Sequence, residues 1–399
     1  MRILIITDWQ KLQGGAEAYI LALRDGLIEA GDEVELLTSS ASPVARQHAD
    51  HVTFASDGLL AKSVLQIVNP FAVATVRRVT RDFKPDLVIV NMFALYLSPA
   101  SVLALGNIPY VLIVSDYKCI CPMGHRLLPD GSVCEQAIGR ACYRSACLSL
   151  PHWLRDQPRY ALIKRVLKQA SRVISVGNSM QDILQQQGVS SIPLPLFSSE
   201  PGESYRRDCA GDPLFLFLGR LDVEKGVDTL IHAFARLRME VPKSRLRIVG
   251  RGKLRESLER LAIELGQKNA IEFCGWMEPD QVEMEISRAW ALVAPSRWVE
   301  PFGLVALEAL LRGVPAIVTD AGGFSEQVKH GETGLVFPID DIDALRKNML
   351  MIAMGQVFAE HQLKPEHVAA VRQTYNIDSH LSQLRTLLKE TVLRDGDRA

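Results

Sequence analysis

Short, mostly apolar runs alternate with longer amphipathic segments along the first half of the chain. The apolar runs occur at residues 2–6, 34–37, 86–90, 110–114 and 172–176. Continuous apolar runs of this length are typical of parallel strands that are covered on both faces. An amphipathic segment at 16–30, followed by Gly31, predicts a helix between the first two strands. This half of the chain is therefore predicted to be a series of βαβ units around a parallel sheet.

A stretch rich in proline and serine separates this series from a second one. Residues 190–213 contain four prolines and show little periodicity, as interdomain linkers do. The alternation then restarts, with strands predicted at 214–218, 247–249, 271–273, 291–294, 315–319 and 334–337. We expect an α/β protein of two doubly wound, Rossmann-like domains, at 1–195 and 213–374, joined by a linker at 196–212. Because ligands of such sheets bind at the carboxyl ends of the strands, we expect the site in a cleft between the domains.

Composition narrows the class of protein. The chain has 399 residues, of which 48% are hydrophobic and 23% are charged, as in soluble globular proteins of about two domains. A formal net charge of −1 gives no electrostatic case for nucleic acid. The first residues have too short an apolar stretch for a signal peptide, and no apolar run is long enough to span a bilayer. We expect a cytoplasmic protein, with contact at the inner face of the membrane as an alternative.

Glu300 precedes an apolar run, 304–311, that is predicted to be a buried helix, and Glu308 falls in the middle of that run. A carboxylate within such a helix is destabilising unless something pairs with it. One interpretation is a polar ligand at the helix start, with a hydroxyl group of that ligand bound to Glu308. The alternative is an ion pair between Glu308 and Arg312, one turn later on the same helix.

A loop after the first strand of the second series carries two cations, Arg220 and Lys225. Positive charge and the backbone amides of a helix start are what a diphosphate group requires. The alternative is a solvated loop with ordinary surface charges. Glycines at 14–15, 250 and 252, and 322–323 allow close approach of the backbone to a phosphate or sugar, or else plain tight turns.

These motifs, in their order along the chain, resemble those of a known family. The matching residues are Gly219-Arg220, Glu224-Lys225-Gly226, Gly250-x-Gly252, Pro295-Ser296, the unit from Glu300 to Glu308, and Gly322-Gly323 with Glu326. They resemble the nucleotide-binding half of the large retaining glycosyltransferase family usually numbered four (glycosyl transferases group 1), which has the GT-B fold. The resemblance covers residues 214–345 and is looser in the first domain, where it rests on residues 14–17.

The resemblance implies that charged side chains of the second domain hold a nucleotide-diphosphate sugar, the donor substrate. Arg220 and Lys225 would hold the diphosphate and stabilise the charge of the leaving group. Glu308 would bind the ribose hydroxyls, and Glu300 would contact hydroxyls of the donor sugar. The remaining implied donor contacts are Phe302, Gly303 and Leu304 through their backbone amides, Gly14 and Gly15 at the diphosphate, and Gly250 and Arg251 at the nucleobase.

The implied reaction is glycosyl transfer of the hexosyltransferase type, with retention at the anomeric carbon. No catalytic metal is expected, because the cations and the helix dipole stabilise the leaving group. Family habit suggests an acceptor that is a growing glycan or lipid-linked saccharide of the cell surface, bound by the first domain near Asp116. Many relatives carry a histidine before this aspartate, where the present chain has Ser115. A helix at about 375–399 is implied to pack back on the first domain.

The same residues disfavour other functions. A sugar epimerase of the same fold would need additional acid and base groups in the cleft. A phosphorylase of this fold would need a cofactor lysine and a longer chain. Neither set of features is evident in the sequence. A non-catalytic nucleotide-sugar-binding protein is disfavoured because all four charged residues of the motifs are present, namely Arg220, Lys225, Glu300 and Glu308. A nicotinamide-dependent dehydrogenase is set aside because no G-x-G-x-x-G follows the first strand.

Five of the seven cysteines crowd into a segment, 117–150, that is rich in Gly, Pro and Arg and that we interpret as an insert. Without an export signal, this crowding favours a metal site or free thiols over disulfides. Thiolates of Cys121, Cys134, Cys142 and Cys147 would close around a structural zinc ion, although the paired C-x2-C spacing of zinc ribbons is absent. Free or redox-active thiols, an iron–sulfur cluster and disulfides remain alternatives.

The stretch after the insert, residues 153–168, mixes cations with Trp153, Tyr160, Ile163 and Leu167. An amphipathic helix on a domain surface accounts for this pattern. The alternative is a membrane-facing patch, which would suit a lipid-linked acceptor.

Overall fold

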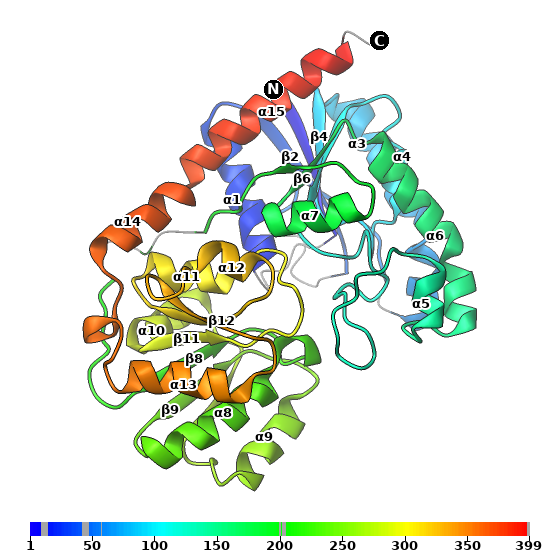
Figure 1. Cartoon of the computed structure of the whole chain (residues 1–399). Coiled ribbons are helices and arrows are strands. Elements are labelled where there is room, and N and C mark those ends of the chain that lie inside the picture. Colours follow the sequence, from blue (N-terminus) through cyan, green and yellow to red (C-terminus); the bar gives the residue numbers. More distant parts are fainter. Residues whose placement is uncertain (9–14, 42–47, 57, 199–200, 202–204, 397–399) are drawn as a thin grey trace. The chain divides into compact units, whose positions relative to one another are not determined.

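The computed structural model describes residues 1–8, 15–41, 48–56, 58–198, 201 and 205–396 of the chain. These residues form two compact units (Figure 1). Unit 1 comprises Met1–Phe197 together with Ile377–Ala399, and unit 2 comprises Ser198–Asn376. The stretch 196–212, which was expected to be a linker, begins beside this boundary. Gly14, one of the candidate donor contacts, lies outside the described residues.

Unit 1 is built on a parallel sheet whose described strands have the order β3-β2-β1-β4-β5-β6-β7. The strands are β1 (Arg2–Ile6), β2 (Glu33–Ser39), β3 (His51–Thr53), β4 (Leu87–Val90), β5 (Tyr110–Val114), β6 (Arg172–Ser175) and β7 (Ile192–Pro193). The central strands β1 and β4 are buried over almost their whole length. This is why their sequences are continuously apolar and lack the alternation of a half-exposed strand.

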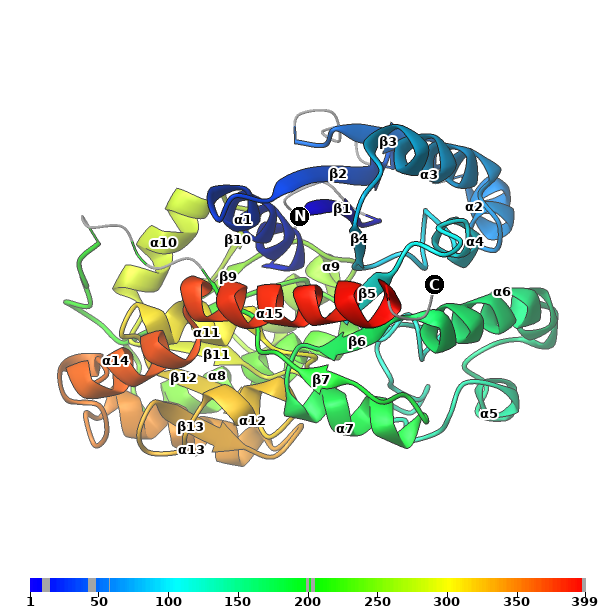
Figure 2. The ribbon, with the colours of Figure 1, turned by 90° about the horizontal axis from the view of Figure 1, so that it is seen from above.

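The helices of unit 1 cover this sheet. They are α1 (Gly15–Glu29), α2 (Leu59–Leu65), α3 (Pro70–Phe83), α4 (Pro99–Leu103), α5 (Arg140–Arg144), α6 (Leu150–Gln169), α7 (Asn178–Gln186) and the C-terminal α15 (Ile377–Gly396). Helices α3, α4 and α6 contact one another in series, and α1 contacts α15. Figure 2 shows α15 running along unit 1 as one long helix.

The C-terminal helix α15 belongs to unit 1 although more than 170 residues of unit 2 precede it. His380 accepts or donates a hydrogen bond with the hydroxyl of Tyr19 in α1 at 2.9 Å. Arg385 pairs with the carboxylate of Asp32 at 2.9 Å, and Arg172 pairs with Glu390 at 2.8 Å. Leu384 and Leu388 of α15 are fully buried, so polar contacts and apolar side chains both attach α15 to unit 1.

Unit 2 is also built on a parallel sheet, whose described strands have the order β10-β9-β8-β11-β12-β13. The strands are β8 (Leu214–Leu218), β9 (Arg245–Val249), β10 (Ile271–Gly275), β11 (Ala291–Ala294), β12 (Ala316–Thr319) and β13 (Gly334–Phe337). The helical elements are η1 (Val223–Lys225), α8 (Val227–Glu240), α9 (Arg255–Glu264), α10 (Pro279–Arg288), α11 (Leu304–Leu311), α12 (Gly323–Gln327), α13 (Ile342–Ala353), η2 (Ala359–His361) and α14 (Pro365–Thr374).

Helices cover both faces of the unit 2 sheet (Figure 1). One layer holds α9, α8 and α13, and the other holds α10, α11 and α12. The core between sheet and helices is closed by fully buried aromatic and aliphatic side chains, among them Phe215, Phe234 and Ile248. The predicted α/β class with two Rossmann-like units is therefore confirmed. No helix in the described parts of the chain combines the length and the apolar character needed to cross a bilayer.

Candidate functional site

A short ion pair at the carboxyl ends of the unit 2 strands joins Lys225 and Glu300. Lys225 lies in η1 after β8, and Glu300 lies in the loop between β11 and α11. The ammonium of Lys225 donates to Oε1 of Glu300 at 2.6 Å, and the hydroxyl of Ser296 donates to the same oxygen at 2.6 Å. Glu300 is only 5% exposed. Because β8 and β11 are neighbours in the sheet, residues 75 positions apart meet at its edge.

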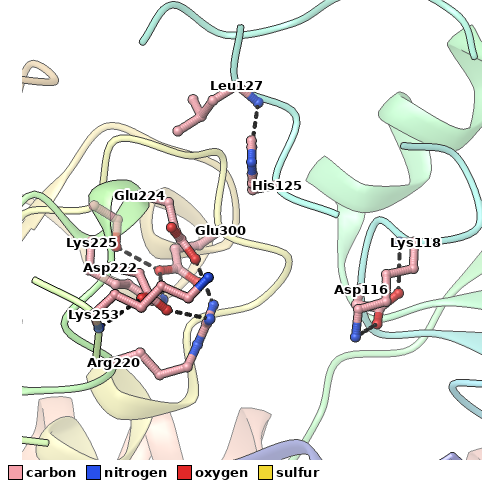
Figure 3. Close-up of polar contacts among 11 residues, drawn as sticks. Asp116, Lys118, His125, Leu127, Arg220, Asp222, Glu224, Lys225, Lys253 and Glu300 are labelled. Carbon is pink, nitrogen blue, oxygen red and sulfur yellow. Dashed lines mark hydrogen bonds and ion pairs between the residues drawn. The ribbon is translucent and has the colours of Figure 1, made fainter. Parts of the chain in front are cut away.

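Arg220 stands beside this pair in the same loop after β8 (Figure 3). Its guanidinium donates to Asp222 at 2.7 Å and to Glu224 at 2.8 Å, and its side chain is 57% exposed. The ion pairs orient the guanidinium without burying it. The structure therefore brings together three of the predicted residues, Arg220, Lys225 and Glu300. The exposed guanidinium of Arg220 is accessible to an anionic ligand from solvent.

The start of helix α11 adds backbone donors next to Glu300. Among the described residues, no acceptor reaches the amides of Phe302, Gly303 or Leu304. Unpaired amides and the helix dipole make such a start a site for anions. The loop before α11 is held by the amide of Gly323, which donates to the carbonyl of Glu300 at 2.9 Å. The three amides predicted to assist Glu300 are thus available to a ligand.

Gly303 is the residue whose backbone makes this helix start possible. It has φ +93°, and a Cβ atom there would lie 2.4 Å from the ring of Phe324. We predict that Gly303→Ala lowers the free energy of unfolding by about 3 kcal/mol, from strain and overpacking together. Gly331→Ala is the matched control, because Gly331 also has positive φ (+82°) but open space around it. Its expected loss is about 1 kcal/mol, and equal losses in urea unfolding would contradict the packing argument.

Glu308 follows one turn later on the same helix and is half-buried. Burial raises the pKa of its carboxyl group to about 7, and the charge of Arg312 opposes the shift. The pairing of Glu308 with Arg312, one of the two sequence interpretations, is wrong. Arg312 donates to the backbone carbonyl of Glu308 and forms its ion pair with Glu283 at 3.6 Å. No hydrogen bond or ion pair reaches the Glu308 carboxylate from the described residues.

The loop after β9 contains the predicted nucleobase residues Gly250 and Arg251. Gly250 has φ +140°, and a Cβ atom there would lie 1.8 Å from the carbonyl oxygen of Gly219. Glycine is therefore required because two βα loops cross at this point, which is a reason that sequence reasoning had not given. Arg251 is exposed, and its nucleobase role stays a prediction. In unit 1, Gly15 begins helix α1.

Asp116 lies at the end of β5 in unit 1, where it lines a hollow with Ser115, Lys118 and Met92. Its carboxylate accepts from the amide of Lys118 at 2.9 Å and pairs with the ammonium of that residue at 3.4 Å (Figure 3). The hydroxyl of Ser115 donates to Asn91 Oδ1 at 2.8 Å. Sequence reasoning missed Asn91 and Lys118, although Asn91 directly follows the predicted strand 86–90.

A third residue missed at this edge of unit 1 is Asp8, which follows β1. Its buried carboxylate accepts from the backbone amides of Leu95, Tyr96 and Leu97 at 2.7 to 2.9 Å. Burial raises the pKa of Asp8, and these three amides oppose the shift. Asp8 therefore fixes the loop after β4 that borders the hollow of Asp116. Its position at a strand end was the available signal.

The four predicted zinc ligands, Cys121, Cys134, Cys142 and Cys147, line one common hollow within the segment 117–150. Burial and the neighbouring thiols raise the pKa values of Cys142 and Cys147. All seven cysteines are free. In the described parts of the chain, no group of three or more cysteine, histidine or carboxylate side chains is placed as a ready-made metal site. The predicted grouping is therefore present, but the sulfurs do not yet form a closed coordination shell.

Helix α6 begins at Leu150, earlier than the sequence indicated, and carries the stretch 153–168. Tyr160 and Ile163 are buried in unit 1, so these two residues do not belong to a membrane-facing patch. Leu150 and Leu154 are the large apolar side chains that the helix exposes.

Comparison with known proteins gives the family of both halves. A family model described as glycosyl transferases group 1 matches residues 208–361, and a model described as a glycosyl transferase 4-like domain matches residues 14–195. The chain belongs to glycosyltransferase family 4. The resemblance noted from the motifs is thereby confirmed, and the family 4 models cover both the loops that hold Lys225 and Glu300 and the hollow of Asp116.

Named relatives of this family 4 chain include the glycogen synthase of Mycobacterium tuberculosis, which is 38% identical over 195 residues, 48% of this chain and 46% of that one. The matches to the first curated relatives span about a third to a half of their length. Among solved structures, sucrose-phosphate synthase from Thermosynechococcus elongatus has a TM-score of 0.75 at 21% identity, over 98% of this chain and 99% of that one. HepE of Anabaena, solved in complex with UDP, has a TM-score of 0.72 at 18% identity, over 98% and 100%. These likenesses show the GT-B fold.

Proposed function

We propose that this chain transfers a hexosyl group, with retention at the anomeric carbon, from a nucleotide-diphosphate sugar to a hydroxyl group of a saccharide or lipid-linked acceptor. The bond between the anomeric carbon and the diphosphate oxygen breaks, and a bond to the acceptor oxygen forms. The acceptor proton leaves with the departing diphosphate. The observation that carries the proposal is the ion pair between the partly exposed Lys225 and the buried Glu300, beside the free amides at the start of α11.

Lys225 and Arg220 are the groups that would take up the charge of the leaving diphosphate. Both are held by carboxylates at 2.6 to 2.8 Å, so their charges are oriented before the ligand arrives. Preorganised charges of this kind stabilise a developing anion without reorganisation during the reaction. The amides of α11 would add donors to the same anion. This supports a leaving group that carries more than one negative charge.

Glu300 and Glu308 would bind hydroxyl groups of the donor. Each ionised carboxylate accepts hydrogen bonds only, which matches the hydroxyls of a sugar or a ribose. Oε1 of Glu300 is already occupied by Lys225 and Ser296, which leaves its second oxygen for the donor sugar. The acceptor role that we propose for unit 1 rests on the hollow beside Asp116 and Lys118.

The test is release of nucleoside diphosphate from a panel of UDP-, GDP- and ADP-sugars, with and without simple sugar acceptors. We expect nucleoside diphosphate to be released only from donors that carry one of the three nucleobases. We also expect the anomeric proton coupling of any product to match that of the donor. An inverted anomeric centre would overturn the retaining mechanism. No release from any donor at micromolar enzyme would contradict the transferase proposal itself.

A further inference from the structure

The insert between β5 and α6 has little regular structure of its own. Within residues 115–149 the described backbone forms only the five-residue helix α5 and an isolated bridge between Leu127 and Val133. Most side chains from 129 to 149 are exposed or only partly buried. Loops of this length are rarely ordered by packing alone, and small segments with little core are usually held by disulfides or a structural metal.

Four of the five cysteines in the insert line one hollow. Cys121, Cys134, Cys142 and Cys147 line the same hollow, which we call the cysteine hollow, and apolar residues such as Met123 and Leu127 complete its wall. Cys119 lies only two residues from Cys121 but lines the separate hollow of Asp116. The grouping therefore selects four particular thiols from a cysteine-rich stretch.

The four thiols come from two small elements, two from each. Cys121 precedes and Cys134 follows the turn that the Leu127–Val133 bridge closes. Cys142 lies in α5, and Cys147 follows it, where the amide of Leu148 donates to the carbonyl of Cys142 at 3.0 Å. A turn flanked by two thiols, together with a short helix that has one thiol in it and one after it, can enclose an ion tetrahedrally.

We propose that the cysteine hollow binds one Zn²⁺ ion through these four thiols. Each thiol loses its proton to solvent on binding, and the four sulfurs move in to Zn–S distances of about 2.3 Å. This closure is required, because no ready-made metal site exists among the described residues. The complex carries a net charge of −2, and Arg140 and Arg144 lie on α5 on either side of Cys142. Four thiolates favour zinc over magnesium or calcium.

Such a site is structural, since four protein ligands leave no open position for substrate. Its role is to order the insert that follows Asp116, and it is independent of the donor contacts proposed for unit 2. Loss of the site would therefore leave nucleoside diphosphate binding intact. Loss of nucleoside diphosphate binding would likewise say nothing about zinc.

The experiment is metal analysis of the full-length protein purified without chelator under anaerobic, reducing conditions. We expect about one zinc per chain in the wild type and in Cys119→Ser, and less than a tenth of that in Cys142→Ser. Cys119→Ser is the matched control, because this cysteine belongs to the insert but not to the cysteine hollow.

A second measurement uses the wild type alone, in case Cys142→Ser does not fold. Apo-protein titrated with Co²⁺ is expected to develop the sulfur-to-cobalt charge-transfer absorption of a tetrathiolate site, saturating at one equivalent and abolished by Zn²⁺. Wild-type protein that contains no zinc and binds no cobalt overturns the proposal. So does an iron–sulfur absorption spectrum, a thiol titration that shows disulfides, or zinc loss in Cys119→Ser equal to that in Cys142→Ser.

Discussion

Replacing Lys225 with methionine is expected to lower kcat for sugar transfer by about 10²–10³-fold, the loss typical of one preorganised donor at a developing anion. Methionine keeps most of the volume of the side chain but removes its charge. The same change leaves the buried carboxylate of Glu300 with Ser296 as its remaining partner. We therefore also expect a loss of about 2 kcal/mol in the free energy of unfolding.

The double variant Lys225→Met with Glu300→Gln separates the two effects. It removes the unpaired charge, so most of the lost stability is expected to return, while transfer stays at the level of Lys225→Met or below. Urea unfolding and steady-state kinetics on the same preparations measure both quantities. Wild-type kcat in Lys225→Met would refute the assignment of this lysine, whereas loss of activity that recovers together with stability would show a purely structural role.

Changing Glu308 to glutamine is expected to stabilise the ligand-free protein at pH 8. The pKa of Glu308 is raised to about 7 by burial, so the folded state favours the protonated carboxyl group. The stability that this proton contributes is fully present below about pH 4.5 and is lost as pH rises through about 7. The free energy of unfolding that this proton contributes falls by at most about 3 kcal/mol between low and high pH. Glutamine imitates the protonated form and removes this dependence.

The measurement is urea unfolding of the wild type and Glu308→Gln at pH 5 and pH 8. The variant should exceed the wild type by less than about 1 kcal/mol at pH 5 and by clearly more at pH 8, and Glu264→Gln, an exposed control on α9, should show no such difference. The nucleotide should bind Glu308→Gln about tenfold more weakly than it binds the wild type at pH 8, because a hydrogen bond to a charged group is lost. A variant that is less stable at both pH values would contradict the account of Glu308.

Much of the fold could be predicted because parallel strands leave a plain signal. Runs such as residues 2–6 and 110–114 are apolar without interruption, as buried strands must be, and both are strands in the structure. Helix α3 was missed although Asn69 and Pro70 mark its start. Asn69 caps it by accepting from the amides of Phe71 and Ala72 at 3.1 Å.

The contacts of the site were harder to predict than its members. The order of motifs identified Lys225 and Glu300, but only the adjacency of β8 and β11 shows that they hold each other. The apparent partner of Glu308 was wrong for a similar reason, since Arg312 is taken by Glu283 from α10. Pairing between residues on different elements depends on packing that a spacing rule along one helix does not contain.

The central claim is that the loops after β8 and β11 bind a nucleoside diphosphate, and calorimetric titration tests it most directly. We predict that UDP, GDP or ADP binds the wild type, that Lys225→Met weakens this binding by about ten- to a hundredfold, and that Glu264→Gln leaves it unchanged. Absence of binding for all three nucleotides, or equal affinity in the wild type and Lys225→Met, would contradict the claim.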